Sequence, residues 1–201
     1  MLTVRKPGLE LRQRYLDSQA KLNFTYTEVG ATATTPPINY AIDHTRIALG
    51  AGESVFHAGR RGLERWEQFR LGWLDAWPPE TPISAGETVL VVVRVFGVWS
   101  LNAARIVYVV DESSESMSRF GFAYGTLPGH VEAGEERFLV EWNKSNNRVW
   151  YDILAFSRPR HLLPRLGNFQ VRRMQKRFAR ESADSMLRSV QQTSAAAAFS
   201  E

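Results

Sequence analysis

The chain contains no cysteine among its 201 residues. Disulfides, thiolate nucleophiles and cysteine-ligated zinc are therefore excluded, and a reducing compartment is compatible with that absence. Long hydrophobic runs are also missing, because the most apolar stretch, Val89 to Val110, is interrupted by Arg94, Asn102 and Arg105. Such a broken stretch predicts no transmembrane segment, and residues 1–10 lack the apolar part of a signal peptide. We expect a soluble, cytoplasmic protein.

Catalytic and cofactor motifs are absent as well. The sequence has no P-loop and no serine nucleophile set between glycines. Gly50-Ala51-Gly52 lacks the third glycine of a dinucleotide-binding loop, and the four histidines show no paired metal-ligand spacing. We therefore expect no cofactor and no metal, and a binding protein is favoured over an enzyme.

The residues that are present suit one globular domain with a sizeable core, since 44% are apolar and 23% are charged. Aromatic residues make up 11%, with six tryptophans and eleven phenylalanines, which favours a roomy interior. The net charge is +4, and its excess lies in the last third of the chain. Such a cluster can meet nucleic acid or anionic lipid, but we favour the solvated face of an amphipathic helix, so nucleic acid is not an expected partner. The cluster consists of Arg158, Arg160, Arg165, Arg172, Arg173, Lys176, Arg177 and Arg180.

Hydrophobic periodicity divides the chain into three parts. Residues 1–39 hold a short helix and an extended connection rich in Thr, Ala and Gly. Residues 40–190 form the main domain, with a first strand over 42–49, a helix over 53–69, a strand series up to residue 156, and a long final helix. Residues 191–201 are expected to be a flexible tail.

Strict alternation marks the strand series. Aromatic residues at Phe120, Phe122 and Tyr124 alternate with small residues, which predicts one face turned inward and a bare face open to another segment. Two further sets are each expected to share one face of a strand. These sets are Ala104, Ile106, Tyr108 and Val110, and Trp150, Asp152, Leu154 and Phe156.

The order of these elements predicts an α+β fold, because a lone antiparallel sheet must bury one face and the late helix can cover it only by lying across it. This order resembles the helix-grip fold of START-like, Bet v 1-like (SRPBCC) proteins, in which a curved antiparallel sheet wraps around a long C-terminal helix. The stretches RFGFAYGTLPGHVEAGEERF (119–138) and VWYDILAFSRPRHLLPRLGNFQVRRMQKRFARES (149–182) resemble uncharacterised protein family 0548. The resemblance spans about 25–186. It implies a cavity between sheet and helix and transfers no catalytic residue.

One loop carries a possible acid/base pair. His130 and Glu132 lie between two expected strands, where a loop would overhang the mouth of a cavity, and a carboxylate can orient an imidazole and raise its pKa. The alternative is a plain Pro-Gly turn with exposed side chains.

Asp152 is a second candidate, because alternation places it on the same face as Trp150 and Phe156. An inward carboxylate could hold a polar ligand group or act as a general acid. We favour the alternative of a salt bridge to an arginine such as Arg94, Arg105 or Arg119, or a position near the rim of the sheet.

The favoured function is binding of a small hydrophobic or amphipathic ligand between sheet and helix. The alternatives are an enzyme using His130 with Glu132, or Asp152, and an interaction module using the basic helix on nucleic acid or anionic lipid. Ligand identity and oligomeric state are not predicted. The candidate ligand-binding residues are Trp73, Trp99, Phe122, Tyr124, His130, Glu132, Trp142, Trp150, Asp152, Met174 and Phe178.

Overall fold

The computed structural model describes residues 1–95, 97–159 and 165–198, with side chains for all of these except 165–171 and 194–198. The strands are β1 (Leu2–Thr3), β2 (Ala41–Ala51), β3 (Leu74–Trp77), β4 (Thr88–Val95), β5 (Val98–Ser113), β6 (Met117–Thr126), β7 (Glu132–Asn143) and β8 (Arg148–Pro159). The helices are α1 (Leu9–Ala20), α2 (Glu53–Glu64) and α3 (Arg165–Ala198), with short 3₁₀ turns η1 (Ala31–Ala33) and η2 (Glu67–Phe69).

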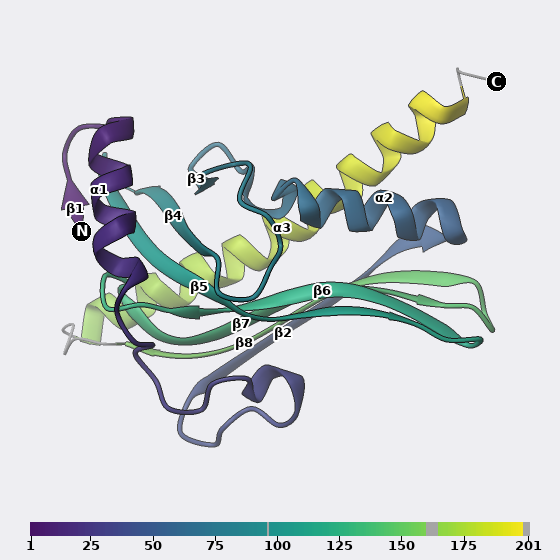
Figure 1. Ribbon diagram of the computed structural model, residues 1–201, viewed down its shortest axis with the longest axis horizontal. Coiled ribbons are helices and arrows are strands. Elements are labelled where there is room, and N and C mark those ends of the chain that lie inside the picture. The colour runs from purple at the N-terminus through teal and green to yellow at the C-terminus, as the bar shows by residue number, and fades with distance from the viewer. Residues whose placement is uncertain (96, 160–164, 199–201) are drawn as a thin grey trace.

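The strands form one sheet in the order β2-β8-β7-β6-β5-β4-β3, with β1 paired to β5. Every pairing in the described sheet is antiparallel. The sheet is curved, and α3 runs diagonally across one face (Figure 1). The expected α+β helix-grip fold is confirmed.

The sheet has two distinct faces. We call the face covered by α2 and α3 the inner face and the opposite one the outer face; the connection between α1 and β2 crosses the outer face (Figure 1). The aromatic face of β6 belongs to the inner core, as expected, and Phe122 there has no exposed surface. Helix α2 fills one half of the inner face, so α3, together with η2, faces the other half.

Two glycines allow α2 to lie close to its neighbours. A Cβ at Gly59 would lie 3.0 Å from Val140 Cγ1, and a Cβ at Gly62 would lie 3.0 Å from Met186 Cε. Side chains of β7 and α3 therefore occupy the space that larger residues on α2 would need. The helix is amphipathic, and Phe56 and Leu63 are buried on the same side.

The connection that crosses the outer face is held by one buried carboxylate. Glu135 of β7, 2% exposed, accepts hydrogen bonds from Tyr26 Oη at 2.8 Å and from the backbone N–H groups of Gly30 at 2.7 Å and Thr32 at 3.0 Å. The Tyr26 ring occupies the space where Gly125 lacks a side chain. The bare face of β6 thus receives another segment, as its alternation predicts.

A β-bulge in β5 overturns one expectation. The register shifts between Ile106 and Tyr108, so these two residues do not share a face. Ile106 belongs to the inner core, whereas the Tyr108 hydroxyl lies 2.8 Å from Thr32 Oγ1 on the outer face. The inserted residue reverses the alternation, which a simple period-two reading misses.

Helix α3 packs through its middle and later turns. Ala183, Met186 and Val190 are buried, and Ser182 Oγ lies 3.0 Å from the Tyr151 hydroxyl of β8. The helix continues to Ala198, into the segment expected as a tail, and residues 199–201 lie outside the described part of the chain. Among the described residues, no helix combines the length and apolar character needed to span a bilayer.

Candidate ligand-binding cavity

A cavity of about 360 Å³ lies between α3 and the half of the inner face that α2 leaves uncovered. Its wall draws on most of the strands, on η2 and on α3. The hydrophobic lining residues include Phe69, Trp73, Leu74, Val91, Val93, Val95, Ile153, Ala155, Met174, Phe178 and Ala179.

Contacts with neighbouring side chains fix the aromatic residues of the cavity wall. Trp73 Nε1 donates a hydrogen bond to Glu181 Oε2 at 2.6 Å, and the Arg177 guanidinium stacks 4.5 Å from the Trp73 ring centre. Phe178 packs on Phe69 with ring centres 5.4 Å apart. These contacts fix flat apolar surfaces on the strand side and the helix side of the cavity.

A buried carboxyl group lies in the wall among these apolar residues. Glu136 of β7 is surrounded by protein atoms. Its side chain keeps some accessible surface, because it borders the cavity. Tyr124 Oη donates a hydrogen bond to Glu136 Oε2 at 2.8 Å. Burial raises the pKa of Glu136 from 4.5 to about 8, the charges of Glu132 and Asp43 add to the rise, and the Tyr124 hydrogen bond opposes it. At neutral pH this carboxyl is mainly protonated.

Two further carboxylates line the same region. Glu132 Oε1 accepts hydrogen bonds from Gln175 Nε2 at 2.7 Å and from Ser157 Oγ at 3.2 Å, and burial raises the Glu132 pKa. Asp43 of β2 forms a bidentate pair with Arg172 of α3, at 2.6 and 3.1 Å. Among the side chains that the structure describes, a guanidinium group lies at hydrogen-bond distance from Asp43 but not from Glu132.

His130 lies at the edge of the cavity in the loop between β6 and β7. Its Nδ1 accepts a hydrogen bond from the backbone N–H of Glu132 at 3.1 Å, and its own backbone N–H closes the turn to Leu127 O at 2.8 Å. The Glu132 carboxylate is directed instead to Gln175 and Ser157. The expected side-chain pair of His130 with Glu132 is not formed.

Apolar side chains reach solvent around the cavity. Leu2 of β1 is 68% exposed, Val98 at the start of β5 is 38% exposed, and Val131 before β7 is 41% exposed. All three also line the cavity. Three segments far apart in the sequence therefore provide a hydrophobic rim.

Six of the eleven sequence candidates lie in the wall of this cavity: Trp73, Tyr124, His130, Glu132, Met174 and Phe178. Their ligand contacts stay a prediction. Phe122 and Trp142 are corrections, because they do face inward but lie under α2, where Trp66 covers Phe122 and Phe56 lies beside Trp142. Helix α2 fills the space that a ligand would need there.

Three candidates lie away from the cavity. Val98 and Ser100 line it, so alternation turns Trp99 to the other side of β5, where it packs near Leu101 and Trp77. Tyr151 and Ile153 of β8 belong to the inner core, so Trp150 and Asp152 point to the outer face. The expectation of an inward Asp152 is wrong, because its neighbours Tyr151 and Ile153 occupy the inner face and alternation turns Asp152 to the outer face.

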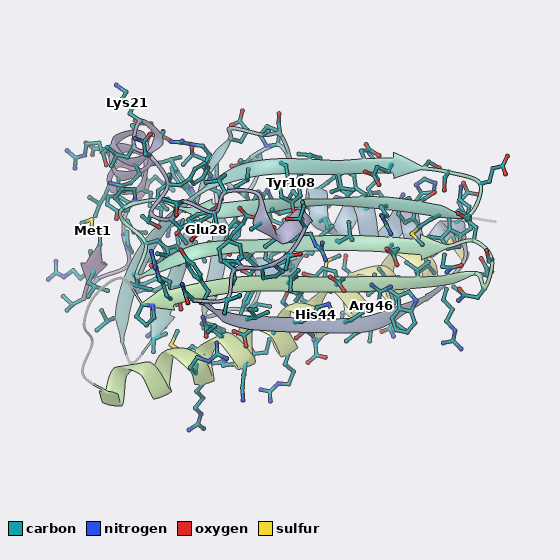
Figure 2. All side chains as sticks on the ribbon, turned by 90° about the horizontal axis from the view of Figure 1, so that it is seen from below. Met1, Lys21, Glu28, His44, Arg46 and Tyr108 are labelled. Carbon is teal, nitrogen blue, oxygen red and sulfur yellow. The ribbon has the colours of Figure 1, made fainter. Side chains whose placement is uncertain are left out.

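Asp152 is the centre of an ion-pair network on the outer face. Its side chain is 3% exposed and accepts from Arg137 Nη2 at 2.9 Å and from Arg46 Nη1 at 3.3 Å, while His44 Nε2 lies 2.7 Å away. His44 and Arg46 lie along β2 on this face (Figure 2). Burial would raise the Asp152 pKa, but the hydrogen bonds of His44 and Arg137 outweigh it and hold the pKa below its ordinary value. A salt bridge was the favoured alternative, although its arginines differ from those expected.

Glu136 and the valines of β4 are cavity residues that the sequence reading does not select. Glu136 shares the inward face of β7 with Phe138, so alternation could have identified it as a polar residue on an apolar face. Both faces of the strand around Val91, Val93 and Val95 are apolar in the sequence apart from Arg94, so alternation does not distinguish the side that borders the cavity. Within the described part of the chain, no three histidine, aspartate or glutamate side chains could together hold a metal ion.

The chain was compared with known families and proteins. Residues 25–185 match the family DUF1990, a domain of unknown function. A UPF0548 protein of Dictyostelium discoideum is 35% identical over 207 residues, covering 94% of this chain and 96% of that protein. A UPF0548 protein of Arabidopsis thaliana is 37% identical over 154 residues, covering 75% of this chain and 74% of that protein.

Solved structures show more distant similarity. Hypothetical protein jhp0584 from Helicobacter pylori has a TM-score of 0.48 at 12% identity, covering 82% of this chain and 94% of that chain. Human STARD10 has a TM-score of 0.45 at 10% identity, covering 93% of this chain and 81% of that chain. Ara h 8.0201 has a TM-score of 0.46 at 10% identity, covering 74% and 99%.

Proposed function

Since the chain belongs to the DUF1990 family, a domain of unknown function, we propose from its own geometry that it binds a small amphipathic molecule between sheet and C-terminal helix. The apolar body of that molecule would lie against Phe69, Trp73 and Phe178. Its polar group would reach Glu136 and Tyr124.

One observation carries this proposal: a cavity of about 360 Å³ with a largely apolar wall and a few convergent polar side chains. Small-molecule sites commonly combine apolar walls with a few placed polar groups that fix orientation. The polar set includes Tyr124 and Glu136 together with Gln175, Ser157 and Glu132. The wall draws on elements far apart in the sequence, so the cavity depends on the whole fold.

The hydrophobic rim supports entry of an apolar molecule from outside. Leu2, Val98 and Val131 are exposed and also line the cavity. An apolar ligand would replace water along this path, which favours its transfer from solvent.

A cavity-filling variant tests the proposal. Ala179 of α3 lines the cavity, so Ala179→Trp would occupy part of it with a large ring. We expect the wild-type protein to bind the neutral dye Nile red saturably at one site. The variant should bind it at least about tenfold more weakly, since overlap of ring and ligand costs more than the ring's own contacts return. Fluorescence titration measures both affinities.

Ala51→Trp is the matched control, because Ala51 is exposed at the far end of β2 and lines no part of this cavity. It should leave the dye affinity unchanged. Circular dichroism and thermal melting would verify that both variants fold. Equal dye affinity in folded Ala179→Trp and wild type would contradict binding in this cavity.

The two alternatives have less support from the geometry. Asp152 lies on the outer face, away from the cavity, and the Glu132 carboxylate is directed to Gln175 and Ser157, whereas His130 Nδ1 accepts from the backbone N–H of Glu132. The basic charges of α3 are partly neutralised, because Arg172 pairs with Asp43 and Arg177 with Glu181. The ion pairs of Asp152, Arg172 and Arg177 favour a structural role for these three side chains.

A further inference from the structure

The ionisable side chains that line the cavity are mostly acidic, although the protein as a whole is basic. The chain carries a net charge of +4, yet Asp43, Glu132, Glu135 and Glu136 contribute to the cavity wall. In the part of the chain whose side chains are described, no lysine or arginine lines it. Binding of a purely apolar molecule would not explain why acidic side chains line the cavity of a basic protein.

Two of the four carboxyl groups are not available to a molecule in the cavity. Asp43 is paired with Arg172, and Glu135 is turned to the outer face, where Tyr26 and Thr32 donate to it. Glu132 and Glu136 remain. Their described hydrogen-bond partners are the neutral groups of Gln175, Ser157 and Tyr124, and no described arginine or lysine forms an ion pair with either.

Burying a carboxylate without a cation at hydrogen-bond distance is costly, and burial raises the pKa of both groups, that of Glu136 to about 8, so Glu136 holds a proton at neutral pH. The side chain of Glu136 borders the cavity, so a bound cation could take the place of that proton. A cation would also lie near electron-rich ring faces, since Trp73, Phe178 and Tyr124 form part of the same wall. Carboxylates beside aromatic faces are the combination that recognises an ammonium group on an apolar body.

We propose that the cavity selects lipophilic amines, with the ammonium group held by Glu136 and Glu132 and the hydrocarbon part against the aromatic wall. This inference rests on the proposed function and adds the chemical class of the ligand. Anionic amphiphiles such as fatty acids are disfavoured, because no lysine or arginine among the described side chains lines the cavity to compensate a buried carboxylate.

The charged and titratable groups around Glu136 determine its response to a cation. Tyr124 on β6, Tyr151 on β8, Asp43 on β2 and Glu132 on β7 act on it. Arg172 on α3 pairs with Asp43, and its charge also opposes the rise in the Glu132 pKa. Burial keeps both tyrosines protonated by raising their pKa. An arriving ammonium group therefore displaces a proton from Glu136, and not from a tyrosine.

Three amphiphiles with the same chain length and different head groups test the proposal at pH 7: octylamine, octanol and octanoate. NMR titration of the full-length protein, observing the indole N–H of Trp73, gives their relative affinities. Octylamine should bind about tenfold or more tightly than octanol, and octanoate most weakly. Calorimetry in two buffers of different ionisation enthalpy should show proton release with octylamine and none with octanol.

Glu136→Gln keeps the size of the side chain and its hydrogen bond with Tyr124 but removes the ionisable group. It should weaken octylamine binding about tenfold, reduce the proton release and leave octanol binding nearly unchanged. Glu112→Gln, at an exposed position near the end of β5, controls for the loss of one negative charge and should change none of these values.

The outcomes separate the two proposals. Octanol or octanoate binding as tightly as octylamine would overturn amine selection while leaving a ligand-binding cavity in place. Unchanged octylamine affinity in Glu136→Gln would also overturn it. Absence of any response to all three compounds would contradict the proposed function itself.

Discussion

Asp152 shows how a single buried charge is compensated in this protein. The carboxylate is almost inaccessible to solvent and has three cationic or potentially cationic neighbours, Arg137, Arg46 and His44. Removing a buried partner leaves the remaining charges without compensation, which costs more than the pair itself contributes. Asp152 is therefore important for folding on the face opposite to the cavity.

Asp152→Asn should lower the free energy of unfolding by about 2–4 kcal/mol, measured by urea denaturation at pH 7. The native pKa of Asp152 is depressed, so its stabilising contribution is present above the ordinary carboxyl pKa and is lost as the pH falls through the native value. Ligand affinity should not change, because the side chain points away from the cavity.

Asp111→Asn is the control for this prediction. Asp111 pairs with Arg60 at 2.9 Å, but the two side chains are 55% and 32% exposed. Exposed ion pairs contribute little, so the loss should be under about 1 kcal/mol. Similar losses of unfolding free energy in the two variants would show that the buried Asp152 network stabilises the protein no more than an exposed ion pair does.

At the scale of the element, α2 determines where the cavity ends. Its buried face packs Phe56 and Leu63 onto the inner face of the sheet, and Trp66 lies two residues after the end of the helix. The two glycines bring the helix close to β7 and α3, at some cost in helix propensity. A helix lying further out would leave space above Phe122 and Trp142, and these two residues would then border a larger cavity.

The two glycines of α2 should respond differently to alanine. A Cβ at Gly62 would meet the flexible end of Met186, whereas a Cβ at Gly59 would meet Val140 Cγ1 and, at 3.1 Å, Leu49 Cδ1. Gly62→Ala should raise the free energy of unfolding by about 0.5–1 kcal/mol through helix propensity. Gly59→Ala should lower it by about 1–2 kcal/mol, because branched side chains cannot yield as easily.

Chemical denaturation of the two variants under identical conditions measures this difference. Circular dichroism would verify an unchanged helix content. Equal effects at the two positions would contradict the explanation from packing.

At the scale of the whole molecule, the ionisation of Glu136 couples the cavity to stability. Its native pKa of about 8 lies above the ordinary 4.5, so between these values the folded chain retains a proton that the unfolded chain has lost. Stability must therefore fall as the pH rises through this window. Burial also raises the pKa of Glu132, which adds to the same trend.

Glu136→Gln should remove most of this dependence. The stability difference between variant and wild type should shift by about 3 kcal/mol in favour of the variant from pH 5 to pH 8. Denaturation at several pH values measures it, with Glu112→Gln as the exposed control. Parallel pH profiles for wild type and Glu136→Gln would show that Glu136 is not held in its protonated form.

The arrangement of elements follows from sequence patterns. Alternation in β6, the helical period of α2 and the late position of α3 are sufficient for an antiparallel sheet gripped by a helix. The same patterns identify Trp73, Tyr124, Met174 and Phe178, which border the cavity. Alternation identifies these residues because it predicts which side chains point inward, without predicting what they contact there.

Tertiary structure alone decided which inward-facing residues line the cavity and which are covered by α2 and Trp66. Phe122 and Tyr124 belong to the same face of β6, but Trp66 covers the first and the cavity borders the second. Alternation also fails at the bulge in β5, which turns Tyr108 outward. The period of a strand relates residues to one another, but it does not specify which segment covers each of them.

The chemistry of the cavity was likewise decided by folding. Glu136 is an ordinary glutamate in the sequence, and it acquires its raised pKa only because β7, β6 and β2 bring it into an apolar interior beside Glu132 and Asp43. The sequence by itself determined the sheet, the helix and the sign of the total charge. Long-range packing decided the ionisation of the carboxyl group in the cavity, because desolvation depends on neighbours that no local pattern specifies.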